Sequence, residues 1–548
     1  MTPAPALSQA LARAEAAEAA GDRAAAAEAW GQLCSAGSGD WRVWSNYGGA
    51  LAALGRWLEC AKALRRAADL NPAEPLLRQA AASALAQAGR HDEGADELKL
   101  WVEAAPADPI NNLLLARLLA DLGRHEESDQ QLDAAARVAT GKGLAGDRGG
   151  LIRIATASGK PDLNLLRELG RLLERTNRLD DLRNLIGEAE VLGIERGKLG
   201  YPAAAVALRD GDAPEAKRLL LADRPDEDPV RWHWLMARIA DAQGDSETAF
   251  AEAEAMNRSS NDFAGWRERC RSHLGRLRSI ADTVTPEWAA RIPPIELGGR
   301  RSPAFLVGFP RSGTTLLDTF LMGHPKVAVL EEVPLIRAIE SVLGNIAGLP
   351  DRSPDQLAKA RDAYFAELDK HVDPGFDGLV IDKLPLNLLA VPFIRAVFPD
   401  SPIVFAQRHP CDCVLSCFMQ GFALNASMAC FLDIGDSADF YDAALTLWTR
   451  CRETLPVKVH TLVYEELIAD PKAALRPLVD FLGLDWNEEL LDHRATAKAR
   501  GAISTPSYDQ VVQPLNDRAS GRWCRYEKQL ERALPILLFW AERLGYPK

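Results

Sequence analysis

Residues 304–315 read Ala-Phe-Leu-Val-Gly-Phe-Pro-Arg-Ser-Gly-Thr-Thr, an apolar strand pattern that runs into a tight loop and then into the helical pattern of residues 316–322. In a strand-to-helix turn with glycines at Gly308 and Gly313, successive backbone N–H groups can point at one anion, and the helix N-terminus adds a favourable dipole. The stretch therefore predicts an α/β domain with an anion-binding loop at the end of a strand.

The loop differs from a Walker A loop, which reads G-x-x-x-x-G-K-[ST] and places its lysine on the terminal phosphates. Here Gly308 and Gly313 keep the glycine spacing, but Thr314 occupies the lysine position and Arg311 lies inside the loop. A guanidinium offers planar, multidentate donors to phosphate or sulfate. The pattern disfavours an ATPase or a kinase-like enzyme, and a plain turn is the structural alternative.

Length and composition set the broad class. The chain has 548 residues, 47% of them hydrophobic, which is more than one core usually organises, so at least two domains are expected. The net charge of −13 argues against a nucleic-acid partner, so any anion site must be built locally. No export signal or membrane-spanning apolar run is visible. A cytoplasmic protein is predicted.

The nine cysteines are scattered and do not have the spacing of a disulfide framework. Three of them, Cys411, Cys413 and Cys417, lie close together in sequence. Their spacing is not that of a zinc knuckle, and no matching Cys or His pair follows. We interpret them as buried apolar thiols and predict no metal site.

An internal repeat organises the first half of the chain. Four glycines recur every 34 residues, namely Gly21, Gly55, Gly89 and Gly123, and Pro72 and Pro106 share this interval. Each unit has an Ala/Leu-patterned helix, a glycine turn and a second such helix, and these units closely resemble tetratricopeptide repeats. Ala61, Ala67 and Ala95 are expected where two helices approach each other. A nonrepetitive helical bundle is the alternative.

The spacing predicts where the repeats resume and where they end. Asn177, Gly211 and Gly244 continue the period, while the Gly-rich residues 138–162 indicate an irregular repeat or an insertion. Prolines and a Gly-Gly pair in residues 280–302 are typical of a linker. We therefore predict an all-α tetratricopeptide-repeat solenoid over 1–279, a linker over 280–302 and an α/β domain over 303–548.

Strand and helix patterns alternate in the second half. The candidate strands are residues 305–307, 379–381, 403–406 and 459–463, separated by helical stretches, which favours a parallel sheet covered on both faces. Ligands of such folds bind beyond the carboxyl ends of the strands. Arg311, Lys383 and Arg408 all follow strands, so three cations are predicted to converge at one edge.

Several short motifs follow one another in this half: Pro310-Arg311-Ser312-Gly313-Thr314-Thr315, Glu331-Glu332, Asp382-Lys383-Leu384-Pro385, and Arg408-His409-Pro410 followed by Ser416. With these motifs, residues 300–548 resemble the P-loop-like sulfotransferases that use 3′-phosphoadenosine 5′-phosphosulfate (PAPS). The stretch is similar to the tyrosylprotein sulfotransferase branch and to bacterial proteins that fuse tetratricopeptide repeats to such a domain. The resemblance implies a PAPS-dependent enzyme without a metal.

The resemblance also implies residue roles at the donor site. The 5′-phosphosulfate would be held by Arg311, Ser312, Gly313, Thr314 and Thr315, and the 3′-phosphate by Arg408 and Ser416. Ser507 would match a serine beside the sulfate, Arg522 replaces a phosphate-contacting lysine of the animal enzymes, and Tyr464 matches a tyrosine near the nucleotide. For Tyr464, a core position at a strand end is the alternative.

Two further residues carry the expected chemistry. Sulfuryl transfer to a hydroxyl requires removal of the acceptor proton, and the resemblance assigns this general-base role to Glu332, with Glu331 in support. Lys383 would stabilise the transferred group or the leaving phosphate oxygen, together with Arg311 and Ser507 in the catalytic set. A solvated acidic loop and a surface lysine are the respective alternatives. His324 and His409 do not occupy the position of the histidine base that many small-molecule sulfotransferases use.

The resemblance leaves the acceptor open. After Glu332 only Arg337 supplies a nearby cation, whereas the animal tyrosine enzymes carry basic residues there. A protein tyrosine is one candidate, and a polysaccharide, lipid or small molecule is another. The repeat groove is expected to bind an acceptor protein or another partner, or to mediate homo-oligomer assembly. A noncatalytic adaptor with a degenerate nucleotide domain is the alternative from a different class.

Overall fold

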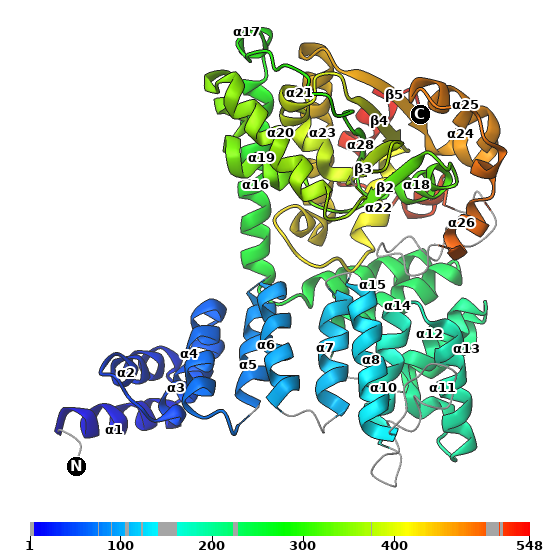
Figure 1. The fold of residues 1–548 in the computed structure, drawn as a ribbon. Helices are drawn as coiled ribbons and strands as arrows, with labels where there is room; N and C mark the ends of the chain where they lie inside the picture. Colours follow the sequence, from blue (N-terminus) through cyan, green and yellow to red (C-terminus); the bar gives the residue numbers. More distant parts are fainter. Residues whose placement is uncertain are drawn as a thin grey trace. The chain divides into compact units, whose positions relative to one another are not determined.

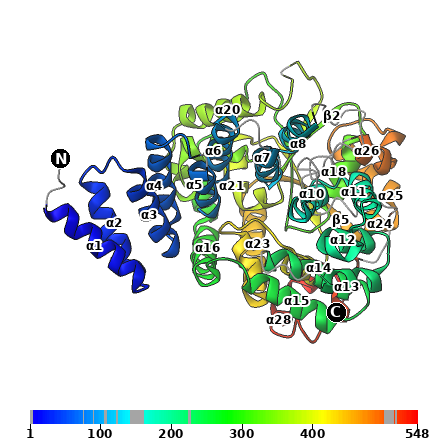
Figure 2. The same ribbon diagram turned by 90° about the horizontal axis from the view of Figure 1, so that it is seen from below.

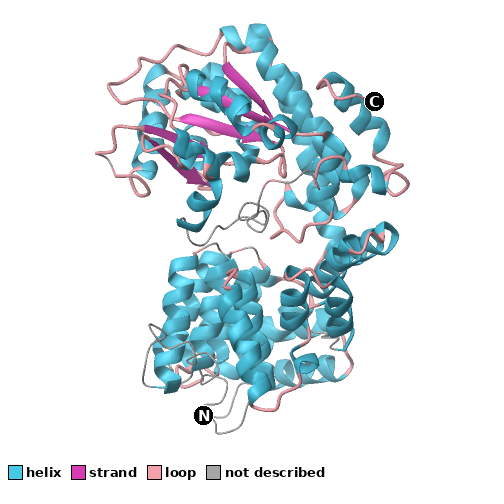
Figure 3. Ribbon diagram, turned by 90° about the vertical axis from the view of Figure 1, so that its right-hand side faces the viewer, coloured by secondary structure: helices cyan, strands magenta, loops and turns pink. Residues whose placement is uncertain are grey.

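The computed structural model describes residues 5–74, 76–88, 90–104, 109–121, 124–140, 162–222, 228–373, 375–499, 515 and 519–547. These residues form two compact units, Met1–Asp228 and Pro229–Lys548. Strands occur only in the second unit among the described residues (Figure 3). None of the described helices is both long and apolar enough to cross a membrane.

The first unit is a series of antiparallel helix pairs, which Figures 1 and 2 show from two directions. The described pairs are α1 (Pro5–Ala19) with α2 (Arg23–Ser35), α3 (Trp41–Ala53) with α4 (Trp57–Leu70), α5 (Leu76–Gln87) with α6 (His91–Ala104), α7 (Pro109–Asp121) with α8 (His125–Thr140), α10 (Leu163–Arg175) with α11 (Leu179–Val191), and α12 (Tyr201–Arg209) with α13 (Ala213–Ala222). The predicted helical repeat is confirmed.

The turns inside these pairs explain the periodic glycines. Gly21, Gly55 and Gly211 have φ angles of 71°, 71° and 86°, and Asn177 takes their place with a φ of 56°. Left-handed backbone costs a Cβ-bearing residue energy, which is why glycine or asparagine recurs there. Ala61, Ala67 and Ala95 are all buried, as the close helix approach requires. Gly89, Gly123 and Pro106 lie outside the described residues.

The second unit begins with helices rather than with a linker. Its first elements are α14 (Pro229–Ala242), α15 (Ser246–Arg258), α16 (Phe263–Thr283) and α17 (Pro286–Ala290). Gly244, which continues the repeat period, forms the α14–α15 turn with a φ of 79°. Residues 280–302 therefore include the end of α16 and all of α17, and the division at 279/280 stays a prediction.

The second unit contains a five-stranded parallel sheet in the order β2-β3-β1-β4-β5. The strands are β1 (Ala304–Gly308), β2 (Val327–Glu331), β3 (Leu379–Lys383), β4 (Pro402–Gln407) and β5 (Lys458–Val463). Four of them match the predicted strands. The sequence patterns did not predict β2, a short edge strand in the run Lys326–Glu332.

Helices cover both faces of the sheet. The helices of this region are α18 (Thr314–Met322), α19 (Ile336–Leu343), α20 (Pro354–Leu368), α21 (Val391–Val397), α22 (Pro410–Phe418), α23 (Ile434–Thr454), α24 (Tyr464–Ala469), α25 (Pro471–Phe481), α26 (His493–Ala499) and α28 (Leu534–Arg543), with short 3-10 turns that include η4 (Met428–Leu432) and η6 (Arg522–Tyr526). The alternating side chains of each strand join two different cores.

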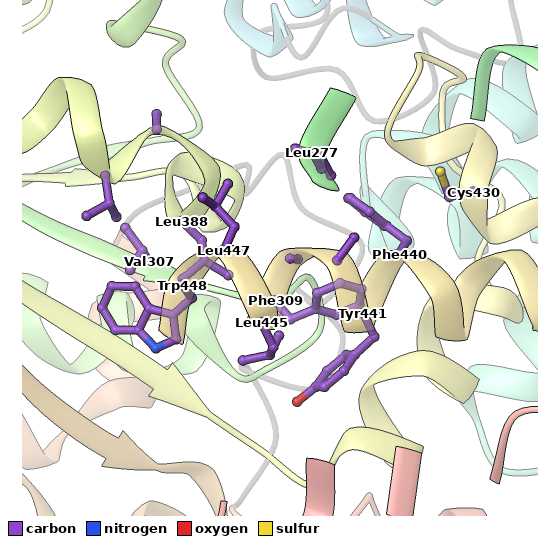
Figure 4. Close-up of a cluster of buried hydrophobic side chains, with 14 of the residues drawn as sticks. Leu277, Val307, Phe309, Leu388, Cys430, Phe440, Tyr441, Leu445, Leu447 and Trp448 are labelled. Atoms are coloured by element: carbon purple, nitrogen blue, oxygen red, sulfur yellow. The ribbon is translucent and has the colours of Figure 1, made fainter. Parts of the chain in front are cut away.

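Strand β1 shows this division. Phe305 and Val307 pack into the larger core with α23, whereas Leu306 joins α18 and α25 on the opposite face. Figure 4 shows part of the larger core, where Phe309 lies beside Tyr441, with ring centroids 4.7 Å apart, and Leu277 of α16 reaches the same cluster. Burial of β1 on both faces fixes the position of the loop that follows it.

Candidate active site

The loop between β1 and α18 is tightly constrained. Gly313 has a φ of 92°, and a Cβ there would lie 2.5 Å from the ring of Tyr464. A Cβ on Gly308 would lie 2.7 Å from the carbonyl oxygen of Ala406. Both glycines are therefore required by close contacts. Thr314 begins α18, so the helix N-terminus opens at the loop as predicted.

Arg311 lies inside this loop in a left-handed conformation, with a φ of 68°. Its Nε donates to Ser416 Oγ at 3.0 Å, and its carbonyl oxygen accepts from Arg408 Nη1 at 2.9 Å. Left-handed backbone at a non-glycine residue is strained and is found disproportionately at functional sites. The structure thus brings Arg311 together with Arg408 and Ser416, which lie about a hundred residues further along the chain.

The donors of this cluster suit a polyanion. Arg408 Nε and Ser312 Oγ are buried and have no hydrogen-bond partner among the described residues. Burial, with a smaller contribution from the neighbouring cations Arg408 and Arg522, lowers the pKa of Arg311 to about 10, so it stays charged at neutral pH. Buried donors without partners are rare in proteins, and a bound anion would satisfy the two in this loop region. We call Arg311, Ser312, Arg408 and Ser416 the arginine cluster.

Tyr464 belongs beside this cluster. It is the first residue of α24, and its ring lies 4.6 Å from the guanidinium carbon of Arg408, within cation–π range. The same ring packs under Gly313. Tyr464 therefore lies at the anion loop, although it also joins the margin of the core around α18.

The other predicted donor-site residues have different surroundings. Thr315 follows Thr314 in the buried first turn of α18. Arg522 Nε donates to Asp241 Oδ1 at 3.2 Å and its Nη2 donates to Met419 Sδ at 3.1 Å. Ser507 lies outside the described residues.

Lys383 occupies the second half of the site. It is the last residue of β3, and its side chain is fully buried, which excludes the surface-lysine alternative. Its Nζ lies 3.1 Å from Asp318 Oδ2, 3.1 Å from Glu331 Oε1 and 3.4 Å from Glu332 Oε1. We call these four residues the lysine cluster.

The three carboxylates keep Lys383 charged. Burial acts to lower the pKa of Lys383, but attraction by Asp318, Glu332 and Glu331 outweighs it, so the pKa is raised. Strand register contributes directly, because Glu331 of β2 pairs with Lys383 of β3. The lysine is thus a permanent ammonium at the carboxyl edge of the sheet.

Glu332 is the carboxylate of this cluster that reaches solvent. Its side chain is 40% exposed, compared with 13% for Glu331. Its backbone is left-handed, with a φ of 55°, and its N–H donates to the carbonyl oxygen of Lys383 at 2.7 Å. This hydrogen bond fixes the turn after β2, so an exposed carboxylate is held against a buried ammonium.

Sequence reasoning missed Asp318. It lies in the apolar run of α18 with no exposed surface and contacts the ammonium of Lys383. A lone acidic residue in the middle of such a helix is the available signal, because a buried carboxylate requires a cationic or hydrogen-bonding partner. The sequence does not show which partner it has.

The histidines and clustered cysteines have structural contacts. His324 Nε2 donates to the carbonyl oxygen of Asp485 at 2.9 Å, and its Nδ1 accepts from Lys326 N at 3.1 Å. The ring of His409 stacks on Trp523. The thiols of the three α22 cysteines are buried, and burial raises their pKa values, to about 12 for Cys411. Such thiols are unreactive, in agreement with the interpretation from sequence.

Comparison with known proteins finds a match to one protein family. The sulfotransferase family model matches residues 303–488. An uncharacterized protein of Aquifex aeolicus is 26% identical over 298 residues, which are 52% of this chain and 38% of that protein. Protein-tyrosine sulfotransferase 1 of Danio rerio is 28% identical over 265 residues, covering 44% of this chain and 71% of the relative. The human enzyme of that name is 28% identical over 273 residues.

Two solved structures are similar to this chain only at low TM-scores. The sulfotransferase domain of the Synechococcus PCC 7002 olefin synthase has a TM-score of 0.32 and 19% identity, over 45% of this chain and 98% of that one. The P58(IPK) TPR domain has a TM-score of 0.18 and 13% identity, over 84% of this chain and 99% of that one. The family match contains the anion loop, both glutamates, Lys383 and Arg408. The C-terminal part of the chain therefore carries a domain of the sulfotransferase family, which follows a series of helix pairs in the sequence.

Proposed function

We propose that the chain is a sulfotransferase that moves the sulfuryl group of PAPS to an acceptor hydroxyl. The observation that carries the proposal is the arginine cluster, a buried set of cations and donors with Arg408 Nε and Ser312 Oγ lacking partners among the described residues. Such a set matches a nucleoside that carries phosphate groups on both the 3′ and the 5′ positions of its ribose, and PAPS supplies the activated sulfuryl group when bound.

The residues of the site divide the work of binding. Arg311, Ser312, Gly313, Thr314 and Thr315 hold the 5′-phosphosulfate through side chains and the N–H groups at the start of α18. The 3′-phosphate is bound by Arg408 and Ser416, with Tyr464 near the nucleotide and Arg522 as a further phosphate contact. Ser507 is assigned a place beside the sulfate. This assignment explains why two arginines approach each other in a buried place.

The lysine cluster supplies the proton acceptor and a fixed positive charge. Glu332 takes the proton of the acceptor hydroxyl while the new O–S bond forms, and the electron pair of the breaking bond leaves on the phosphate oxygen. Lys383 stays protonated and stabilises negative charge at the sheet edge, in the manner of other preorganised cations. Asp318 and Glu331 hold the ammonium, so Glu332 is the carboxylate left to meet solvent.

A protein tyrosine is the first acceptor to test, because several relatives are named protein-tyrosine sulfotransferases. Polysaccharide, lipid and small-molecule hydroxyls are the other candidates. The repeat unit is proposed to bind the acceptor protein or another partner. A cytoplasmic location and homo-oligomer assembly stay predictions.

The decisive experiment is calorimetric binding of 3′-phosphoadenosine 5′-phosphate (PAP), the expected product, compared with ADP. Wild type is expected to prefer PAP, and Arg408→Ala is expected to lose that preference. Arg337→Ala is the matched control, since Arg337 is exposed and lies on α19 outside the arginine cluster. Equal binding of ADP and PAP by wild type would overturn the proposal and favour a degenerate nucleotide domain.

A second measurement identifies the acceptor. Transfer of ³⁵S from labelled PAPS is measured on a tyrosine peptide with acidic neighbours and on the same peptide with phenylalanine. Label on the first peptide alone supports tyrosine. Tight PAP binding without label on either peptide moves the search to carbohydrate, lipid and small-molecule hydroxyls.

A further inference from the structure

Asp241, near the end of α14, collects three hydrogen bonds from one distant segment. Its Oδ1 accepts from the hydroxyl of Tyr526 at 2.6 Å, from Arg522 Nε at 3.2 Å and from Arg525 Nη2 at 3.2 Å. All three donors lie in η6. One carboxylate thus neutralises part of a doubly cationic turn, and hydrogen bonds to charged groups are among the stronger ones in proteins.

The same turn is fixed from its other side by α22. Asp412 accepts from the N–H of Gly521 at 2.7 Å and from the N–H of Trp523 at 2.9 Å. The indole of Trp523 stacks on His409, with ring centroids 5.1 Å apart and an angle of 9° between the planes. In addition, Arg408 donates to the carbonyl oxygen of Ala519. The turn therefore joins α14 to the arginine cluster.

Helix α15 holds the far end of α22. Asn257 Nδ2 donates to the carbonyl oxygen of Phe418 at 3.0 Å and to that of Phe431 at 3.3 Å. The ring of Phe250 stacks on that of Phe418 at 4.8 Å. Asn257 is buried, so these bonds are shielded from water. The α14–α15 pair thus contacts both η6 and the helix whose N-terminal end follows Arg408.

We propose that Asp241 is a positioning residue for the nucleotide site: it holds Arg522 toward the arginine cluster, so the repeat pair α14–α15 is part of the donor-binding machinery. The inference rests on the proposed PAPS site. Arg522 Nη2 also donates to Met419 Sδ at the C-terminal cap of α22, and repulsion by Arg522 contributes to the lowered pKa of Arg311, so an arginine held there adds to the field that a phosphate meets. Without the carboxylate of Asp241, Arg522 and Arg525 repel each other, and η6 loses its hydrogen bonds to α14.

The test is PAP binding by calorimetry in the full chain. Asp241→Asn is expected to weaken PAP binding roughly tenfold, the scale of one lost charge-assisted hydrogen bond. Glu247→Gln is the matched control, because Glu247 is an exposed carboxylate in the first turn of α15 and has no ion pair to η6 within the part of the chain that the structure describes. Unchanged or tighter PAP binding by Asp241→Asn overturns the inference.

A double-mutant cycle separates positioning from general stability. In an Arg522→Met background, Asp241→Asn is expected to cause no further loss of PAP affinity, whereas a purely structural role would give additive losses. Tyr526→Phe removes the hydroxyl donor and leaves both arginines, so it is expected to lower the melting temperature with less than a twofold change in affinity. A loss equal to that of Asp241→Asn would contradict the assignment to Arg522.

PAP binding by the wild type distinguishes failure of the proposed function from failure of the inference about Asp241. If wild type does not bind PAP, the proposed function fails before the inference is reached. If Asp241→Asn does not fold, Asp241→Glu replaces it, because the longer side chain keeps the charge but shifts the carboxylate. A severalfold loss of PAP affinity in that variant supports positioning, and wild-type affinity overturns it.

Discussion

Arg311 and Lys383 are both buried cations at the carboxyl edge of one sheet, yet their surroundings are opposite. Arg311 has other arginines nearby, and its pKa is lowered, first by burial and then by Arg408 and Arg522. Lys383 has three carboxylates within 3.4 Å, and its pKa is raised despite burial. The arginine cluster therefore has an excess of positive charge, whereas the lysine cluster provides its own counter-ions.

This difference in charge predicts that the arginine cluster acts mainly in ligand binding and the lysine cluster mainly in the chemical step. A cluster with surplus positive charge gains most when an anionic ligand completes it, because the ligand satisfies donors that are otherwise costly to bury. A cluster whose ammonium already has carboxylate partners needs no anionic ligand, and those carboxylates hold the pKa of Lys383 above its usual value. We therefore expect changes in the first to alter affinity, and changes in the second to alter turnover and stability.

The largest effect is expected from Glu332→Gln. Loss of a general base slows proton transfer by about 10²- to 10⁴-fold, while PAP affinity stays within about threefold because the arginine cluster is intact. Single-turnover transfer from PAPS to the best acceptor measures the first quantity and calorimetry the second. Glu340→Gln, on α19, is the control and should keep wild-type turnover. If Glu332→Gln lost PAP affinity as well as turnover, the proposed separation between a binding cluster and a chemical cluster would be wrong.

Arg408→Ala should have the next largest effect and the opposite profile. We expect PAP affinity to fall by about 10- to 100-fold, because a charge-assisted contact to phosphate is lost. ADP affinity should change little, which distinguishes a 3′-phosphate contact from a general loss of charge. At saturating PAPS the maximal rate should be largely retained. An equal loss for ADP and PAP would show that Arg408 does not read the 3′-phosphate.

Asp318→Asn tests the balance of the lysine cluster. The variant leaves Glu331 and Glu332 as counter-ions, so we expect the free energy of unfolding to fall by about 1–2 kcal/mol rather than by the larger cost of an unpaired buried charge. Urea unfolding measures this change. The pKa of Lys383 should also fall, so activity should decline at lower pH on the alkaline side. An unchanged alkaline limb would argue that Asp318 does not act on Lys383.

A change in salt concentration should give the smallest effect, and it should act on the arginine cluster more than on the lysine cluster. Raising NaCl from about 50 to about 500 mM should weaken PAP binding severalfold, because chloride competes with the ligand phosphates for the arginine cluster. The stability difference between wild type and Asp318→Asn should stay nearly constant, since buried pairs are screened much less. Calorimetry and urea unfolding at both salt concentrations check the two statements. If salt changed PAP affinity and the stability difference to the same extent, the two clusters would not differ in the way proposed.

Local patterns predicted much of this arrangement, and long-range pairing limits the rest. The loop around Arg311 and the strands before Lys383 and Arg408 have local signals, and parallel strands bring their ends together. Strand β2 is a short run at the edge of the sheet, where the sequence pattern is weak. Asp318 has a local signal, a lone acid in an apolar helix, but its partner is 65 residues away in sequence.

The contacts of Asp241 had no such signal. Its partner Arg522 is 281 residues away, and the carboxylate lies in a helix that the sequence assigns to the repeats. Periodicity describes how a helix packs on its neighbours in a repeat, but it contains no information about a turn near the other end of the chain. Ser507, whose role rests on resemblance, stays a prediction.

The side-chain amide of Asn257 limits where a fragment that contains the sulfotransferase-family domain can start. A fragment that starts at residue 303, where the family match begins, lacks this amide and the ring of Phe250. Two main-chain oxygens would then lose their donor, at a cost of about 1–3 kcal/mol each if they stayed buried. A transferable module therefore has to include α15, as the unit Pro229–Lys548 does, and an exchange of the upstream helix pairs should leave that helix in place.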